Sequence, residues 1–132
     1  MEIISNSSAR TREIAFEYAK SLCKGDVVLL SGDLGAGKTE FVKGVAQYFN
    51  IKEQVTSPTY AYLNIYGDFI YHYDCYRLSS GEDAELLGLT DYFNGENICF
   101  IEWAENIVDS LPENCKKVQI QKIDEETRKI LL

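Results

Sequence analysis

The residues with the clearest chemistry form a glycine-rich segment, Gly32-Asp33-Leu34-Gly35-Ala36-Gly37-Lys38-Thr39. Glycines let the backbone turn its N–H groups toward an anion, and the lysine and hydroxyl at the end add a positive charge and a metal ligand. We therefore expect Lys38 to neutralise the β- and γ-phosphates of a nucleotide and Thr39 to bind Mg²⁺. The pattern predicts a phosphate-binding loop in which residues 33–39 contact the cofactor.

The flanks of this segment favour the same interpretation. Val27 to Leu30 is an apolar, β-branched-rich run, typical of a buried parallel strand, and Glu40 to Ala46 has helical spacing. A strand, a glycine loop and a helix therefore follow one another, so that the start of the helix adds further N–H groups and a partial positive charge.

A carboxylate follows a second buried strand. Ile98 to Ile101 is apolar and leads directly to Glu102, and open α/β sheets bind ligands at the carboxyl ends of their strands. Glu102 is therefore the candidate acid on the metal side of the site, although Asp is the usual residue there. Glu102 could ligate Mg²⁺ directly, act through a water molecule, or orient the attacking water.

Two further clusters could belong to this site. On an extended strand His72, Asp74 and Tyr76 would share one face, and Asp74 could organise Mg²⁺ or the attacking water. We expect His72 to be a hydrogen-bonding residue beside Asp74 rather than a catalytic base, and Arg77 to form a structural ion pair rather than a phosphate contact.

Hydroxyl groups also surround a proline, in the segment from Thr56 to Thr59. This segment could be a nucleotide-sensing loop, or only the entry to the next strand.

Composition limits the classes of function. The 132 residues suit one domain, and 45% hydrophobic residues are typical of a globular protein. A net charge of −8 makes direct nucleic-acid binding unfavourable. The sequence shows no signal-peptide pattern and no run of membrane-spanning length, so we expect a cytoplasmic protein without membrane contact. The four cysteines are widely scattered, which predicts reduced and mostly buried thiols.

The remaining patterns predict an α/β fold like that of P-loop NTPases, with a mainly parallel central sheet, flanking helices and antiparallel hairpin additions. We expect an edge strand at Ile3-Ile4, a helix capped by Ser7 or Ser8 that ends at Gly25, and a second helix that ends near Asn50. Hairpins are expected over 59–76, around Gly67-Asp68, and over 118–132. A short helix over 79–89 and a turn capped by Thr90 or Asp91 complete the expected elements.

Four blocks in this order, Gly-Asp-Leu-Gly-Ala-Gly-Lys-Thr, Thr-Ser-Pro-Thr-Tyr, His-Tyr-Asp-Cys-Tyr-Arg-Leu and Ile-Glu-Trp, resemble the TsaE (YjeE) family of bacterial ATPases. The resemblance implies an Mg²⁺-dependent ATPase for threonylcarbamoyladenosine modification of tRNA, weak by itself and coupled to a TsaB–TsaD heterodimer in which TsaD performs the transfer. By position it implies a catalytic or switch role for Asp74, phosphate and metal contacts for Lys38, Thr39 and Glu102, and a mobile nucleotide-facing loop from Thr56 to Thr59. Trp103 would lie beside the nucleotide.

Two alternatives share the glycine loop. A small-molecule P-loop kinase would need a second-substrate segment or an arginine-rich lid, and only Arg77 lies between the loop and the final hairpin. A guanine-nucleotide switch would need a base-reading motif; Gln121-Lys122-Ile123-Asp124 has Gln where Asn is usual and precedes a hairpin turn rather than a helix.

Overall fold

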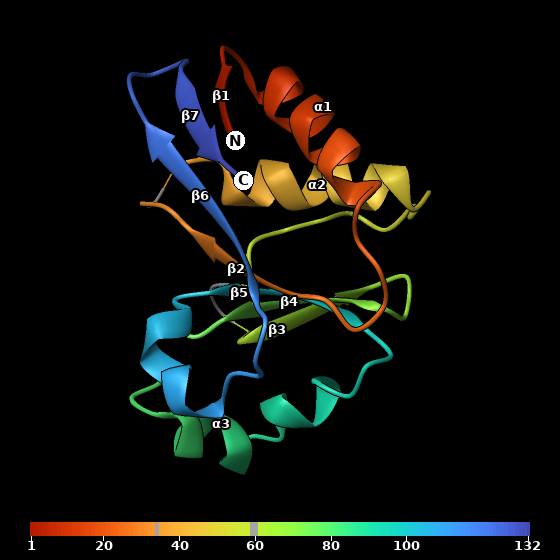
Figure 1. Cartoon of the computed structure of the whole chain (residues 1–132), viewed down its shortest axis with the longest axis vertical. Helices are drawn as coiled ribbons and strands as arrows, with labels where there is room; N and C mark the ends of the chain where they lie inside the picture. Colours follow the sequence, from red (N-terminus) through yellow and green to blue (C-terminus); the bar gives the residue numbers. More distant parts are fainter. Residues whose placement is uncertain (34, 59–60) are drawn as a thin grey trace.

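The computed structural model describes residues 1–33, 35–58 and 61–132. In this part of the chain seven strands form one sheet, in the order β1-β7-β6-β2-β5-β4-β3 (Figure 1). The strands are β1 (Glu2–Ser5), β2 (Val27–Ser31), β3 (Leu63–Tyr66), β4 (Ile70–Asp74), β5 (Ile98–Glu102), β6 (Lys116–Lys122) and β7 (Arg128–Leu131). The helices are α1 (Ser8–Ala19), α2 (Lys38–Tyr48) and α3 (Gly81–Leu86), with the 3₁₀ helices η1 (Leu89–Tyr92) and η2 (Ala104–Ser110).

The middle of the sheet is parallel and its edges are antiparallel. β2 pairs in parallel with both β5 and β6, and β4 pairs in parallel with β5. Antiparallel pairs join β3 to β4, β6 to β7 and β1 to β7. The predicted mainly parallel sheet with two hairpins and an N-terminal edge strand is therefore confirmed, with the first hairpin beginning at Leu63.

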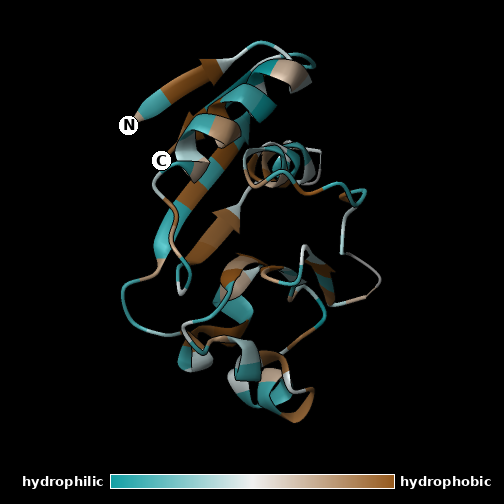
Figure 2. Cartoon of the chain, turned by 90° about the vertical axis from the view of Figure 1, so that its right-hand side faces the viewer, coloured by the Kyte–Doolittle hydropathy of each residue, from teal (hydrophilic) through white to brown (hydrophobic). Residues whose placement is uncertain are grey.

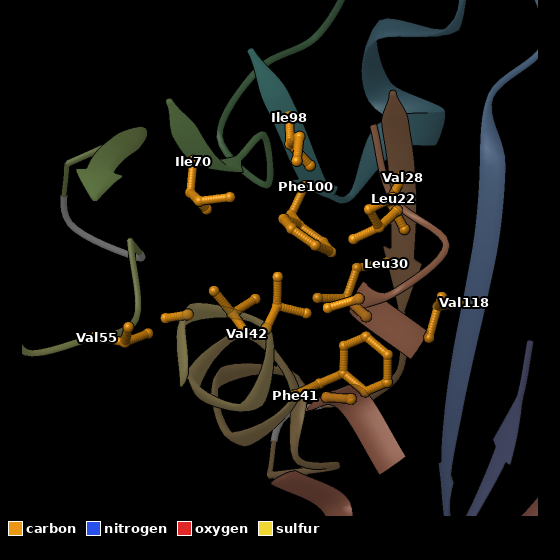
Figure 3. Packing of buried hydrophobic residues seen from close by; sticks show 14 of the residues in the cluster. Leu22, Val28, Leu30, Phe41, Val42, Val55, Ile70, Ile98, Phe100 and Val118 are labelled. Atoms are coloured by element: carbon orange, nitrogen blue, oxygen red, sulfur yellow. The ribbon is translucent and has the colours of Figure 1, made fainter. Parts of the chain in front are cut away.

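Helices cover both faces of the sheet. α1 and α2 lie over one face, and α3, η1 and η2 lie at the other (Figure 1). The α2 side is filled by apolar residues from both layers; Figure 3 shows Phe41 and Val42 of α2 facing Leu30 and Phe100 of the sheet. On the opposite face Tyr73, Cys99 and Ile101 belong to a second buried cluster. Teal and brown residues mix along the helices in Figure 2, as in helices that bury one side.

α1 and α2 are held close together at a glycine. A Cβ atom at Gly44 would collide with the Arg12 carbonyl oxygen and the Ala15 side chain of α1, so only glycine allows this approach. Ser7 caps α1 as predicted, because its hydroxyl accepts a hydrogen bond from the Arg10 N–H at 3.0 Å.

Several predicted element ends are wrong. α1 ends at Ala19 instead of Gly25, because the Ser21 and Leu22 N–H groups bond back only three residues and turn the chain. Gly88, rather than Thr90 or Asp91, is the N-cap of η1. The sequence patterns did not predict η2.

The four cysteines are free, as predicted, but only Cys75 and Cys99 are buried. Burial raises the pKa of Cys75 to about 12 and that of Cys99 to about 11, so both thiols stay protonated at neutral pH. In the described ranges, we find no helix with the length and apolar character needed to cross a bilayer.

Candidate functional site

A cavity of about 1060 Å³ lies where the carboxyl ends of β2, β5 and β4 meet the start of α2. Its lining combines charged groups, hydroxyls and aromatic rings: Asn6, Ser7, Ser8, Thr11, Asp33, Gly35, Gly37, Lys38, Thr39, Glu40, Ser57, Asp74, Tyr76, Glu102, Trp103, Glu125, Glu126 and Arg128. The predicted residues Asp33, Gly35, Gly37, Lys38 and Thr39 are thus brought together with Asp74, Glu102 and Trp103.

The glycine loop leaves its backbone open to this cavity. Gly35 and Gly37 have φ angles of +79° and +110°, and a Cβ atom at either position would meet no atom of the described residues within 4 Å. Gly37 is the N-cap of α2 and provides no side-chain hydrogen bond, so the first N–H groups of α2 have no cap from that residue. Open backbone beside a helix N-terminus fits a bound phosphate chain.

Lys38 lies between the loop and the neighbouring strand end. Its Nζ donates to the Gly32 carbonyl oxygen at 2.7 Å and lies 3.3 Å from Glu102 Oε1. The residue is only 9% exposed, and Nζ lies 5.9 Å from the centre of the Trp103 ring. The amine therefore has protein partners that a phosphate would have to replace.

Glu102 is held from two sides. Its Oε2 lies 2.5 Å from His72 Nε2, and the residue is 5% exposed. Burial by itself would raise the pKa of Glu102, but the hydrogen bond from His72 and the charge of Lys38 lower it overall. Glu102 is therefore an ionised carboxylate at neutral pH.

Asp74 lies next to Glu102 across the sheet, because the two residues are direct partners in the β4–β5 register. Asp74 is 7% exposed, and its Oδ1 accepts a hydrogen bond from the Tyr76 N–H at 2.9 Å. His72 does point to the same side of β4, but its hydrogen bond goes to Glu102 and not to Asp74. The expected hydrogen-bonding role of His72 beside Asp74 is confirmed, and the β4–β5 register supplies Glu102 as its partner.

The hydroxyl-rich segment meets the cavity through Ser57. Thr56 is not among the residues of the described chain that line the cavity. The Tyr66 hydroxyl bonds to the backbone N–H and carbonyl oxygen of Thr56. Asn64 Nδ2 donates to the Thr56 carbonyl oxygen at 3.3 Å and to the Thr56 hydroxyl at 3.4 Å. Thr59, like Leu34 of the glycine loop, lies outside the described residues.

Three other predicted residues have distinct places. Ala36 is fully buried beneath the loop rather than lining the cavity. Trp103 is 39% exposed and packs edge-on against Tyr76, with 4.9 Å between ring centres. Arg77 lies 4.4 Å from the Tyr62 ring centre.

Sequence reasoning missed the contribution of both chain ends. Arg128 of β7 donates to the Ala36 carbonyl oxygen at 2.9 Å and the Gly35 carbonyl oxygen at 3.0 Å, which braces the loop from outside. The start of α1, around Ser7, closes the cavity on the same side. No local sequence signal connects these segments with residues 32–39, since the contact depends on the order of strands in the sheet.

The residues present fit a nucleotide with Mg²⁺. Within the described residues no three His, Cys, Asp or Glu side chains cluster as a metal site. Mg²⁺ needs no such cluster, because it usually takes one or two protein oxygens and completes its shell with phosphate and water. Thr39 and Glu102 would supply the protein ligands.

Comparisons with known proteins agree with this geometry. Residues 5–130 match the family model described as "Threonylcarbamoyl adenosine biosynthesis protein TsaE". A Bacillus subtilis protein named tRNA threonylcarbamoyladenosine biosynthesis protein TsaE is 40% identical over 91% of this chain and 77% of its own length. A Treponema pallidum protein of the same name is 37% identical over 98% of both chains. The crystal structure of Bacillus subtilis YdiB superposes with a TM-score of 0.82 at 34% identity, over 98% of this chain and 82% of that one.

Proposed function

Because this chain belongs to the TsaE family, we propose that it is an Mg²⁺-dependent ATPase for threonylcarbamoyladenosine modification of tRNA. Residues 1–132 would act as one P-loop ATPase domain. Its partners would be TsaD- and TsaB-like proteins in the cytoplasm, with the TsaD-like protein performing the transfer to tRNA. Hydrolysis would be slow without these partners.

One observation carries the ATPase proposal: Lys38 Nζ and Glu102 Oε1 meet at 3.3 Å beside the open loop and the start of α2. A phosphate-binding cation and a metal-side acid are the two charged groups that phosphoryl chemistry requires. They come from different elements, β5 and α2, and lie in one cavity of about 1060 Å³.

The side chains would divide the work as follows. Lys38 leaves Gly32 and Glu102 to contact the β- and γ-phosphates, while the loop N–H groups hold the phosphate chain. Thr39 and Glu102 would hold Mg²⁺, and the ion would supply positive charge to the phosphate oxygens. Asp74, beside Glu102, orients the attacking water, and Ser57 and Trp103 cover the nucleotide at the mouth of the cavity.

The charge of the chain supports a role through partners rather than through direct tRNA binding. At a net charge of −8 the protein has little attraction for a polyanion. We therefore propose that the TsaD-like partner contacts the tRNA and that this chain supplies the energy of ATP hydrolysis.

The test combines binding and turnover. ATP and GTP would compete for the site in calorimetry, and hydrolysis would be measured with and without the purified TsaB–TsaD pair and tRNA. ATP preference and a partner-dependent rise in hydrolysis and in modified tRNA are expected. Preference for GTP would favour a guanine-nucleotide switch, and phosphate transfer to a small acceptor would favour a P-loop kinase. The structure weakens the guanine-nucleotide switch, because Asp124 Oδ1 already accepts hydrogen bonds from the Glu126 and Thr127 N–H groups.

A further inference from the structure

We propose that His72 is a positioning residue: it anchors one oxygen of the Glu102 carboxylate, so that the other oxygen stays directed at the phosphate-binding loop when Lys38 turns to phosphate. This inference rests on the proposed ATPase function and adds a residue to it. It assigns different tasks to the two oxygens of one carboxylate.

The two oxygens already have different partners. Oε2 lies 2.5 Å from His72 Nε2, whereas Oε1 lies 3.3 Å from Lys38 Nζ. An ionised carboxylate can only accept hydrogen bonds, so Nε2 must carry the hydrogen and donate it. His72 therefore holds Oε2, and Oε1 is the oxygen on the side of the loop.

Within the described chain the His72 imidazole makes no other hydrogen bond. His72 is fully buried, and its Nδ1 has no hydrogen-bond partner within residues 1–33, 35–58 and 61–132. Asn64, its direct neighbour on β3, donates instead to Thr56 and Tyr66. An unpaired buried nitrogen destabilises the folded chain, and an apolar side chain of similar size would avoid this cost. Packing by itself does not explain an imidazole here, but the bond to Glu102 does.

Lys38 and His72 differ in how firmly they are placed. Lys38 has a flexible four-carbon stem and is the group expected to move to phosphate. His72 is on a strand hydrogen-bonded on both sides, to β3 and β5, and its ring is enclosed. When Lys38 moves, His72 is the partner that stays with Glu102 and prevents the carboxylate from following the amine.

The bond can be tested first without nucleotide. The chain contains one histidine, so the ring ¹⁵N signals of the tag-free protein belong to His72 without ambiguity. Long-range ¹H–¹⁵N spectra are expected to show a protonated Nε2 and a bare Nδ1, before and after addition of Mg²⁺ and ATP. A hydrogen on Nδ1 with a bare Nε2 would overturn the proposal.

The role can be tested with two matched amides. His72→Gln can place an N–H group near the position of Nε2, whereas the shorter His72→Asn cannot. ATP affinity without Mg²⁺ would be followed by Trp103 fluorescence, and kcat, KM and the Mg²⁺ requirement would be measured with the TsaB–TsaD pair. Because a charge-assisted hydrogen bond is lost, His72→Asn should lower kcat and raise the half-saturating Mg²⁺ concentration about tenfold or more, with Mg²⁺-free ATP affinity within about threefold of wild type.

His72→Gln is expected to restore most of the activity. Wild-type kinetics in His72→Asn would overturn the proposal, and so would equal losses in both variants. Loss of Mg²⁺-free ATP binding in His72→Asn would also overturn it, since that is the sign of a damaged fold. If wild-type protein neither binds nor hydrolyses ATP, the proposed function fails, whereas the tautomer measurement still decides the His72–Glu102 bond.

Discussion

Replacing Glu102 with glutamine should have opposite effects on nucleotide binding and on turnover. Glu102 now holds Lys38 through an ion pair of 3.3 Å in a place where the two side chains are 10% and 6% exposed. In the proposed function ATP would have to draw Lys38 away from this carboxylate, and the carboxylate would also repel the phosphates. In Glu102→Gln both obstacles are removed, so ATP should bind more tightly when Mg²⁺ is absent.

The size of the effect follows from the contact that is lost. Hydrogen bonds to charged groups contribute about 1.5–3 kcal/mol, against about 0.5–1.5 kcal/mol for neutral ones. The amide oxygen of glutamine can still accept a hydrogen bond from the Lys38 ammonium, but it carries no negative charge, so the obstacle to ATP should fall by about 1–1.5 kcal/mol, which corresponds to about a tenfold gain in affinity. Turnover should fall by about a hundredfold or more, because the charge that holds the metal or polarises water is gone.

The assay is titration of ATP with EDTA and then with Mg²⁺, followed by Trp103 fluorescence and calorimetry, together with hydrolysis in the presence of the partners. Glu113→Gln is the matched control, because it changes the net charge equally at an exposed position outside the cavity. Weaker Mg²⁺-free binding in Glu102→Gln would refute the competition between Glu102 and phosphate for Lys38. Wild-type hydrolysis would remove Glu102 from the mechanism.

Four further predictions follow from the same contacts. Lys38→Ala should weaken Mg²⁺–ATP binding about tenfold or more in calorimetry; unchanged affinity with unchanged hydrolysis would contradict the site. Filter retention at physiological salt should detect negligible tRNA binding by the chain alone, and tight, salt-sensitive retention would argue against partner-mediated action. Gly44→Ala should lower the free energy of unfolding by about 1–3 kcal/mol in urea, since the added methyl group meets α1; an unchanged midpoint would contradict that close contact. Burial would raise the pKa of Glu40, but hydrogen bonds from Lys43 and Arg12 lower it overall. The stability that ionised Glu40 adds to the folded protein is therefore present at neutral pH and lost as the pH falls through its folded-state pKa. The Tm difference between wild type and Glu40→Gln should shrink toward acid pH.

The parts of the fold that the sequence predicted depend on local signals. The glycine loop is specified by glycines, a lysine and a threonine within residues 32–39, and its flanking strand and helix are adjacent in the chain. The turn at Gly67-Asp68 likewise specifies the β3–β4 hairpin from neighbouring residues. Glu102 could be placed at a strand end because the apolar run before it fixes where β5 lies.

The parts that could not be predicted depend on strand order and register. Arg128 reaches the glycine loop only because β6 lies between β7 and β2, and nothing near Arg128 in the sequence states that order. His72 meets Glu102 because β4 pairs in parallel with β5 with Asp74 opposite Glu102. A two-residue period puts His72 and Asp74 on one face, but it does not say which neighbouring strand completes the contact.

The packing of β5 therefore also determines where the Glu102 side chain points. Ile98, Phe100 and Glu102 alternate along the face that meets α2, and the first two fill the core on that side. A slip of one residue would turn every side chain to the opposite face. Ile98 and Phe100 would then leave the core under α2, and Glu102 would point away from Lys38. Because the whole strand is buried, the apolar contacts of Ile98 and Phe100 oppose such a slip. The hydrophobic core thus keeps the acid at the distance from Lys38 on which the proposed exchange with phosphate depends.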